Sequence, residues 1–223
     1  MCERARAHLR LLDIKQGRLN ARPPMFYKGE KLKELMGSHL DLQGLGPHVK
    51  KVLTSRLPHD DVKVLDVGTG SAGNAEFLAR FLSKKSRIWT LDPSPEVLAE
   101  ARKTLAAKGL DSKIKFVRAD ASETGLQSGF FECVVSVMTL HHIEDLRPAV
   151  AEMVRVLKGD GKILLVDYKP EAAGKLHFAF RHAESDFFAS SMVADILRSE
   201  RAGVVAHDFD FWYLVEGTKS VAD

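Results

Sequence analysis

The sequence predicts an α/β fold in which a mostly parallel sheet is wound doubly, with helices on both of its faces. From Val62 onward, short apolar segments alternate with helical ones. A glycine-rich turn joins the first apolar segment to a helix, and the last two apolar segments follow each other closely. Regular alternation of strands and helices favours a parallel sheet. The close spacing at the end requires an antiparallel final pair.

Each element has its own signals. We expect five strands, each followed by a helical stretch, at residues 62–67, 87–91, 113–117, 131–137 and 161–167. After the second strand, Ser94 offers a capping hydroxyl and Pro95 occupies the first helical position. That helix should end at Gly109. Two further strands begin at Gly203 and Phe209, without room for a helix between them. Right-handed crossovers place the carboxyl ends of the parallel strands, and hence a ligand crevice, at one edge.

The segment before the sheet is predicted to be helical and basic. Helices are expected at residues 3–16, 30–36 and 46–57, with a break at Pro23 and Pro24. We therefore divide the chain into a helical extension or lid, 1–57, and a core domain, 58–223. Residues 1–35 hold nine Lys and Arg against four Asp and Glu, whereas the whole chain has a net charge of +3. Such an arm attracts nucleic acid or anionic lipid. A solvated helix face is the alternative.

Composition excludes several classes of protein. The chain has 223 residues, ordinary hydrophobic and charged contents, and a pI of about 8.8. Cys2 and Cys133 provide neither a disulfide framework nor metal-ligand spacing, so we expect no metal, and Cys133 should be a core residue. Its apolar runs are too short to span a bilayer, and no apolar stretch follows the basic N-terminus as in a signal peptide. We expect a cytoplasmic protein.

The glycine-rich turn is the most informative motif. Gly68, Gly70 and Gly73 follow a strand, open a helix and match the spacing G-x-G-x-x-G. Glycines allow a tight turn and close approach of a ligand, and the helix N-terminus adds free N–H groups. Acidic residues flank the turn, Asp66 before it and Asp92 at the end of the next strand. The spacing alone also suits a nicotinamide-dependent oxidoreductase.

Taken with the segments 118–121, 131–145 and 157–167, these residues resemble the class I S-adenosylmethionine-dependent methyltransferases. The resemblance covers residues 62 to about 217 and is strongest to the branch containing the ubiquinone and menaquinone biosynthesis methyltransferases. It implies a seven-stranded, Rossmann-like sheet with an antiparallel last strand, S-adenosylmethionine as cofactor, and methyl transfer. Because the dinucleotide fold lacks that antiparallel strand, the end of the chain argues against the oxidoreductase.

The resemblance implies a set of cofactor-binding residues. Asp92 would accept the ribose hydroxyls, with a helix N-cap as the alternative. Asp120 would accept from the adenine amino group, beside the N–H of Ala121; a surface loop acid is the alternative. Asp66 would accept loop N–H groups, or bond the ammonium of the cofactor through water. The full expected set is Asp66, Gly68, Thr69, Gly70, Gly73, Asp92, Pro93, Asp120, Ala121 and Met138.

Two histidines follow the fourth strand and should reach the crevice. His141, and less directly His142, could act as a general base if the acceptor must lose a proton. Alternatively, the pair starts a helix with Glu144 and Asp145 in its first turn. For the acceptor, we expect contacts from the aromatic and histidine-bearing stretch after the fifth strand and from a lid at residues 25–27. The candidate acceptor-binding residues are Tyr27, His177 and Phe180.

Several functions are compatible with these residues. The leading hypothesis is methyl transfer to a small or medium, partly apolar acceptor. RNA or protein could be the acceptor instead, docked by the basic arm. A nicotinamide-dependent oxidoreductase and a cofactor-binding module without catalysis are two further hypotheses. Met138-Thr139-Leu140-His141 replaces the Asn-Pro-Pro-Tyr type of signature, and no crevice cysteine is present, which disfavours amino-directed and 5-methylcytosine chemistry on nucleic acid.

Overall fold

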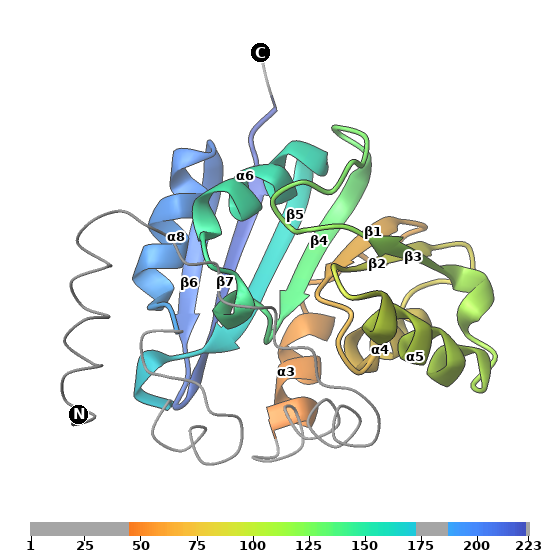
Figure 1. Cartoon of the computed structure of the whole chain (residues 1–223). Coiled ribbons are helices and arrows are strands. Elements are labelled where there is room, and N and C mark those ends of the chain that lie inside the picture. Colours follow the sequence, from red (N-terminus) through yellow and green to blue (C-terminus); the bar gives the residue numbers. More distant parts are fainter. Residues whose placement is uncertain (1–44, 173–186, 222–223) are drawn as a thin grey trace, which may run out of the picture.

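A computed structural model describes residues 45–172 and 187–221 and shows one seven-stranded sheet (Figure 1). Its strand order is β3-β2-β1-β4-β5-β7-β6. The strands are β1 Lys63–Val67, β2 Arg87–Asp92, β3 Ile114–Arg118, β4 Phe131–Val137, β5 Leu157–Tyr168, β6 Ala202–Asp208 and β7 Trp212–Lys219. Strands β1 to β5 pair in parallel, whereas β7 pairs antiparallel with both β5 and β6. The predicted fold class is confirmed.

Helices cover both faces of the sheet (Figure 1). One face packs against α3 Leu45–Thr54, α4 Gly73–Phe81 and α5 Pro95–Ala106, and the other against α6 Leu146–Val156 and α8 Ser190–Ser199. Three short 3₁₀ helices lie in the connections: η1 Asp111–Lys113, η2 Leu140–His142 and η3 Pro170–Ala172. No helix in the described ranges is long and apolar enough to cross a membrane.

The ends of α5 follow the sequence signals. The Ser94 hydroxyl accepts a hydrogen bond from the N–H of Val97, and Pro95 is the first helical residue. At the other end Gly109 adopts a φ of +67°, which lets the N–H of Leu110 reach the carbonyl of Leu105 at 3.0 Å. This predicted helix and its start are confirmed, whereas its last residue is Ala106, two residues before the expected end at Lys108.

Helix α3 packs against the sheet, although the sequence analysis assigned it to the extension. Val49, Leu53 and Leu57 are all buried in the core under this face. Cys133 is also fully buried in this cluster, and burial raises the pKa of its thiol to about 12, as expected for a core residue. The helices predicted at 3–16 and 30–36 lie outside the described residues, so the division at residue 57 stays a prediction.

The expectation that a helical stretch follows every strand is wrong after β3. Residues 119–130 form a loop, because Gly125 and Gly129 both adopt positive φ and Asp120 folds into a turn with Ser122. Helix α6 holds this loop. The Glu152 carboxylate accepts from the N–H and hydroxyl of Thr124, at 2.9 and 2.6 Å.

Strand β5 also begins earlier than the expected residue 161. Leu157 pairs with Phe131, and Lys162 then pairs with Cys133. The extra residues of β5 between these pairs form an irregularity in which Asp160 has a φ of +61°. Bulges of this kind leave residues unpaired and twist the strand locally.

Candidate functional site

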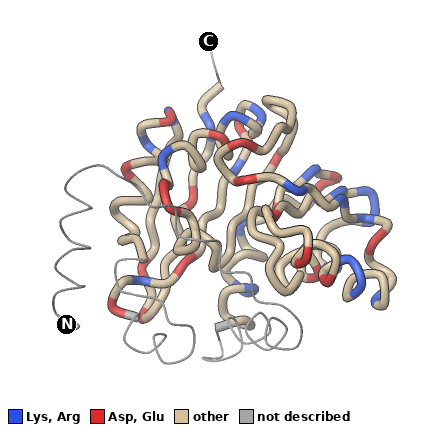
Figure 2. The backbone as a smooth tube through the Cα atoms, viewed as in Figure 1, with Lys and Arg blue, Asp and Glu red and all other residues tan. Residues whose placement is uncertain are grey.

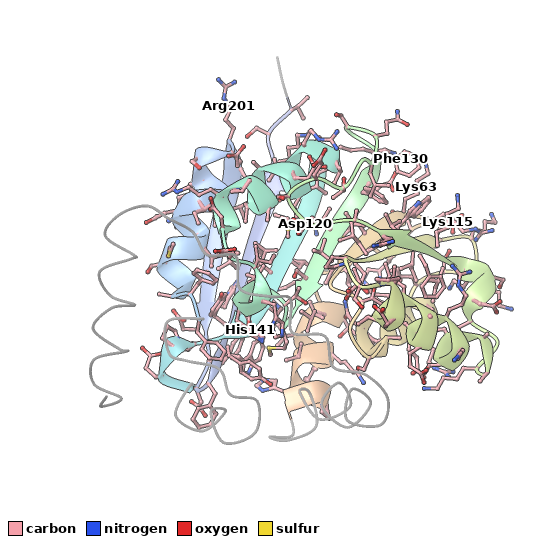
Figure 3. The ribbon with its side chains drawn as sticks, viewed as in Figure 1. Lys63, Lys115, Asp120, Phe130, His141 and Arg201 are labelled. Carbon is pink, nitrogen blue, oxygen red and sulfur yellow. The ribbon has the colours of Figure 1, made fainter. Side chains whose placement is uncertain are left out.

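The carboxyl ends of β1, β2 and β4 meet at one edge of the sheet, where three loops lie together. The loop 68–72 leaves β1, residues 93 and 94 leave β2, and residues 138–142 leave β4. Figure 3 shows His141 at the edge where β4 ends. This is the edge at which doubly wound sheets bind ligands.

The two turn glycines have different surroundings. Gly68 has a φ of +89°, and a Cβ added there would lie 2.1 Å from Thr139 Oγ1. Gly70 has a φ of +47°, and an added Cβ would meet nothing closer than the carbonyl oxygen of Gly68 at 4.0 Å. Gly68 is therefore required by packing against the β4 exit loop. Gly70 leaves open space on the side where a ligand would pass. Gly73 is the first residue of α4, as expected.

Asp66 lies fully buried beneath this loop. Its carboxylate accepts from Asn74 Nδ2 at 2.6 Å and from Thr90 Oγ1 at 2.8 Å. Burial raises the pKa of Asp66 to about 7, the two hydrogen bonds lower it, and the negative charge of Asp92 raises it further. Sequence reasoning missed Asn74 and Thr90. The only sign of Thr90 in the sequence was its place as a threonine within an apolar strand.

Two expectations about this network need correction. The N–H groups of Gly68 and Thr69 donate to the carbonyl of Leu91, at 2.9 and 3.0 Å, and not to Asp66. They do so because the loop turns across the end of β2. The Thr69 hydroxyl is buried 2.8 Å from Thr90 Oγ1, so it faces the interior and not the open side of the loop.

Asp92 lies at the end of β2, where two backbone N–H groups hold its carboxylate. Its Oδ1 accepts from the N–H of Ser94 at 3.0 Å, and its Oδ2 accepts from the N–H of Gly70 at 3.4 Å. Ser94 caps α5, so the interpretation of Asp92 as the N-cap is wrong; Pro93 is exposed in the same turn. Partial burial raises the pKa of Asp92, and the two N–H groups oppose this. A carboxylate has about four acceptor directions, so capacity remains for two ribose hydroxyls. The residues fit S-adenosylmethionine.

The loop after β3 carries Asp120 and Ala121, the residues expected to contact adenine. Asp120, labelled in Figure 3, accepts the N–H and hydroxyl of Ser122 through Oδ1, at 2.8 and 2.7 Å. Ala121 is buried against the sheet face that α6 and α8 cover. This turn fixes the backbone at Asp120 and Ala121. Their contact with adenine stays a prediction.

The β4 exit loop carries the histidines. Met138 has a φ of +52° and is buried in the core, with its N–H donating to the carbonyl of Val166 at 2.8 Å. His141 is 5% exposed, and its Nδ1 lies 2.7 Å from Asp167 Oδ1. The exposed His142 has its ring centroid 4.1 Å from that of His141. Asp167, an acid at the end of an apolar strand, was missed by the sequence reasoning.

The helix-start interpretation of the histidine pair is also corrected. His141 and His142 close the short turn η2, whereas α6 begins at Leu146. Asp145 caps that helix by accepting from the N–H of Arg147 at 3.0 Å. The acid therefore precedes the first turn and does not lie within it.

Part of the expected acceptor side lies outside the described residues, namely Tyr27, His177, Phe180 and the lid at 25–27. Of the aromatic stretch, Phe187 is described and is buried with its ring stacked on His141, 5.1 Å between centroids. Within the described ranges, no cluster of three or more His, Cys, Asp or Glu side chains could hold a metal ion.

Comparisons with known proteins agree with this geometry. Residues 65–165 match the methyltransferase domain family. The ubiquinone/menaquinone biosynthesis C-methyltransferase of Idiomarina loihiensis is 24% identical over 163 residues, covering 73% of this chain and 61% of that protein. The chain thus spans less than two thirds of this curated relative.

Solved structures share the fold. A SAM-dependent methyltransferase from Aquifex aeolicus superposes with a TM-score of 0.72 at 20% identity, over 86% of this chain and 99% of that chain. The [4+2]-cyclase SpnF gives a TM-score of 0.69 at 16% identity, over 96% and 93% of the two chains. A protein named for cyclisation shows that the fold alone does not determine the reaction. Residues 65–165 thus match a methyltransferase domain, and the strand order and the curated relatives make the chain similar to the class I S-adenosylmethionine-dependent methyltransferases.

Proposed function

We propose that this protein transfers a methyl group from S-adenosylmethionine to a small or medium, partly apolar acceptor. The observation that carries the proposal is the carboxylate of Asp92, held at the strand edge by the N–H groups of Gly70 and Ser94. A partly buried carboxylate beside an open glycine turn suits a ligand with a pair of hydroxyl groups. The names of the curated relatives, C-methyltransferases of quinone biosynthesis, favour an aromatic acceptor methylated at carbon.

The contribution of the protein to this reaction is positional. The cofactor supplies a methyl group already activated by a positively charged sulfur. Gly70 would leave room for the bound cofactor, Asp92 would accept hydrogen bonds from its ribose hydroxyls, and the turn at Asp120 and Ala121 would lie beside its adenine. Buried Met138 and Phe187 flank the reacting edge with apolar surface, which keeps water away. Tyr27, His177 and Phe180 are proposed for the acceptor side.

The test is calorimetric titration with S-adenosylhomocysteine, the demethylated product. Asp92→Ala should weaken its binding by about 1–3 kcal/mol, the usual cost of leaving buried hydrogen-bond donors unpaired. Asp195→Ala removes an exposed carboxylate of α8 that pairs with Arg198 and serves as the matched control. Unchanged affinity in Asp92→Ala, with an intact circular dichroism spectrum, would contradict the proposal. Binding of NADH in place of S-adenosylhomocysteine would favour the oxidoreductase.

A further inference from the structure

We infer that Asp167 is a positioning residue that makes His141 the general base for methyl transfer, so that the acceptor is one that gives up a proton. This inference rests on the proposed function and deepens it. It concerns two residues at the ends of neighbouring parallel strands, β4 and β5.

One carboxylate holds both the backbone and the ring of the same histidine. Asp167 Oδ2 accepts from the backbone N–H of His141 at 3.1 Å, and Oδ1 lies 2.7 Å from its Nδ1. Because an ionised carboxylate only accepts, Nδ1 carries the hydrogen in this pair. Nε2 is then the basic nitrogen of the ring, and the ring orientation is fixed.

The pair lies next to the cofactor loop. Thr139, two residues before His141, contacts Gly68 so closely that a Cβ at that glycine would collide with it. The ring of His141 also stacks on that of Phe187 with an interplanar angle of 28°. His141 is thus close in the chain to the contact with the glycine turn and packs on an aromatic ring, beside which a partly apolar acceptor would bind.

The carboxylate of Asp167 is the charged group that contacts this ring. Both side chains of the pair are buried, at 1% and 2% exposure, and within the described ranges Asp167 forms an ion pair with no lysine or arginine. A buried carboxylate stabilises the imidazolium that forms when Nε2 accepts a proton. Burial raises the pKa of the neighbouring Tyr168 and Tyr213, so both stay protonated. The exposed ring of His142 is the other titrating neighbour.

The proton transfer balances the methyl transfer. The hydroxyl proton of the acceptor passes to Nε2, and the electron pair released into the ring forms the new bond between a ring carbon and the methyl carbon. The hydrogen on that ring carbon then leaves as a proton and the carbonyl oxygen gains one, which restores the aromatic hydroxyl. The pair of the broken carbon–sulfur bond stays on sulfur. The positive charge thus moves from sulfur to the imidazolium, which returns its proton to water after turnover.

The experiment compares two acceptors that differ in acidity, hydroquinone and nitrohydroquinone, the second already largely ionised at the assay pH. In Asp167→Asn and His141→Gln, kcat on hydroquinone should fall by about 100-fold, in the range expected for a general base. On the ionised acceptor the loss should be less than about 3-fold, because no base is needed there. KM and S-adenosylhomocysteine affinity should not change. The rise of kcat with pH should disappear in His141→Gln.

His207→Gln is the matched control, because His207 Nε2 and Glu216 Oε1 form a second histidine–carboxylate pair, 2.6 Å apart, on β6 and β7. Equal losses on both acceptors, or an unchanged pH profile in His141→Gln, would overturn the inference. If Asp167→Asn does not fold, His141→Gln decides, since its amide can still donate to Asp167. A wild-type protein that binds S-adenosylhomocysteine but methylates neither acceptor overturns this inference alone. Failure to bind S-adenosylhomocysteine would overturn the proposed function itself.

Discussion

At the scale of single residues, the glycine spacing predicted the backbone conformation of the turn but not the residues that pack against it. The spacing predicted a tight turn at Gly68 and Gly70, and the positive φ of both confirms it. It did not reveal that Gly68 packs against Thr139, because the two residues are distant in the sequence and only the pairing of β1 with β4 brings them together. The buried partners of Asp66 were hidden for the same reason.

This difference separates two substitutions. Gly68→Ala should destabilise the fold by about 1–3 kcal/mol, since its Cβ would overlap the Thr139 side chain and its φ strains any residue with a Cβ. Gly70→Ala should fold with a smaller loss and bind S-adenosylhomocysteine poorly. Urea unfolding and calorimetry measure the two effects. Recovery of stability in Gly68→Ala by Thr139→Gly would confirm the contact, and Gly70→Ala with wild-type affinity would refute the assignment of the open side.

The raised pKa of Asp66 makes stability depend on pH. Its folded value of about 7 exceeds the value of 3.8 expected when unfolded, so the folded state holds the proton more tightly. The stability contributed by this proton is present below about pH 4 and is lost as the pH rises to about 7. Asp66→Asn should reduce the change in the free energy of unfolding between about pH 4 and pH 7. The stability of this variant relative to the wild type should be highest above pH 7. Unfolding of both proteins in urea from pH 4 to 8 measures this; parallel curves would contradict it.

At the scale of elements, the sequence located every described strand. Short apolar runs bounded by turn residues are typical of buried strands, and here they alternate with helical segments. The same alternation predicted a helix after β3. The structure has a loop there, because Gly125 and Gly129 adopt positive φ, which a helix does not contain. The loop instead takes its support from α6. Arg155 donates to the carbonyl of Leu126 and to Glu152, which in turn binds Thr124.

Glu152 should therefore hold the adenine-side loop in place. Its hydrogen bonds, first with Arg155, lower its pKa from 4.5 to about 2. Because the folded value is the lower one, its stabilisation is present above about pH 4.5 and is lost as the pH falls towards 2. Glu152→Gln should cost about 1–2 kcal/mol at pH 7 and less at pH 3, by urea unfolding. Glu171→Gln, an exposed acid, is the control. An equal deficit at both pH values would contradict this account.

At the scale of the whole molecule, the charges divide by region. Residues 36–223 carry 24 Lys and Arg against 26 Asp and Glu, so the basic surplus lies in residues 1–35. Figure 2 shows Lys and Arg interspersed with Asp and Glu along the described backbone. The described residues also complete a core on both faces of the sheet. We therefore expect any attraction to an anionic partner to come from residues 1–35.

Deleting residues 1–24 should leave a folded domain that binds S-adenosylhomocysteine but transfers methyl groups poorly, because an uncovered crevice stays wet. Calorimetry and a radiolabelled methyl-transfer assay measure the two properties. If the acceptor is RNA, the full-length protein should show a steep dependence of binding on salt that the truncated protein loses. Full activity after truncation would contradict both roles and favour the alternative that the arm is a solvated helix face.

The place of β7 in the sheet has a consequence for how the protein is made. Strand β7 leaves the ribosome after β6, yet it lies between β5 and β6. Until residues 212–219 have emerged, the edge of β5 that includes the apolar run Ile163–Val166 is unpaired, and β6 has no neighbour in the sheet. Unpaired edges of this kind recruit other strands. A pause in translation before residue 212 would therefore leave the nascent chain with the unpaired strands β5 and β6, which chaperones would bind.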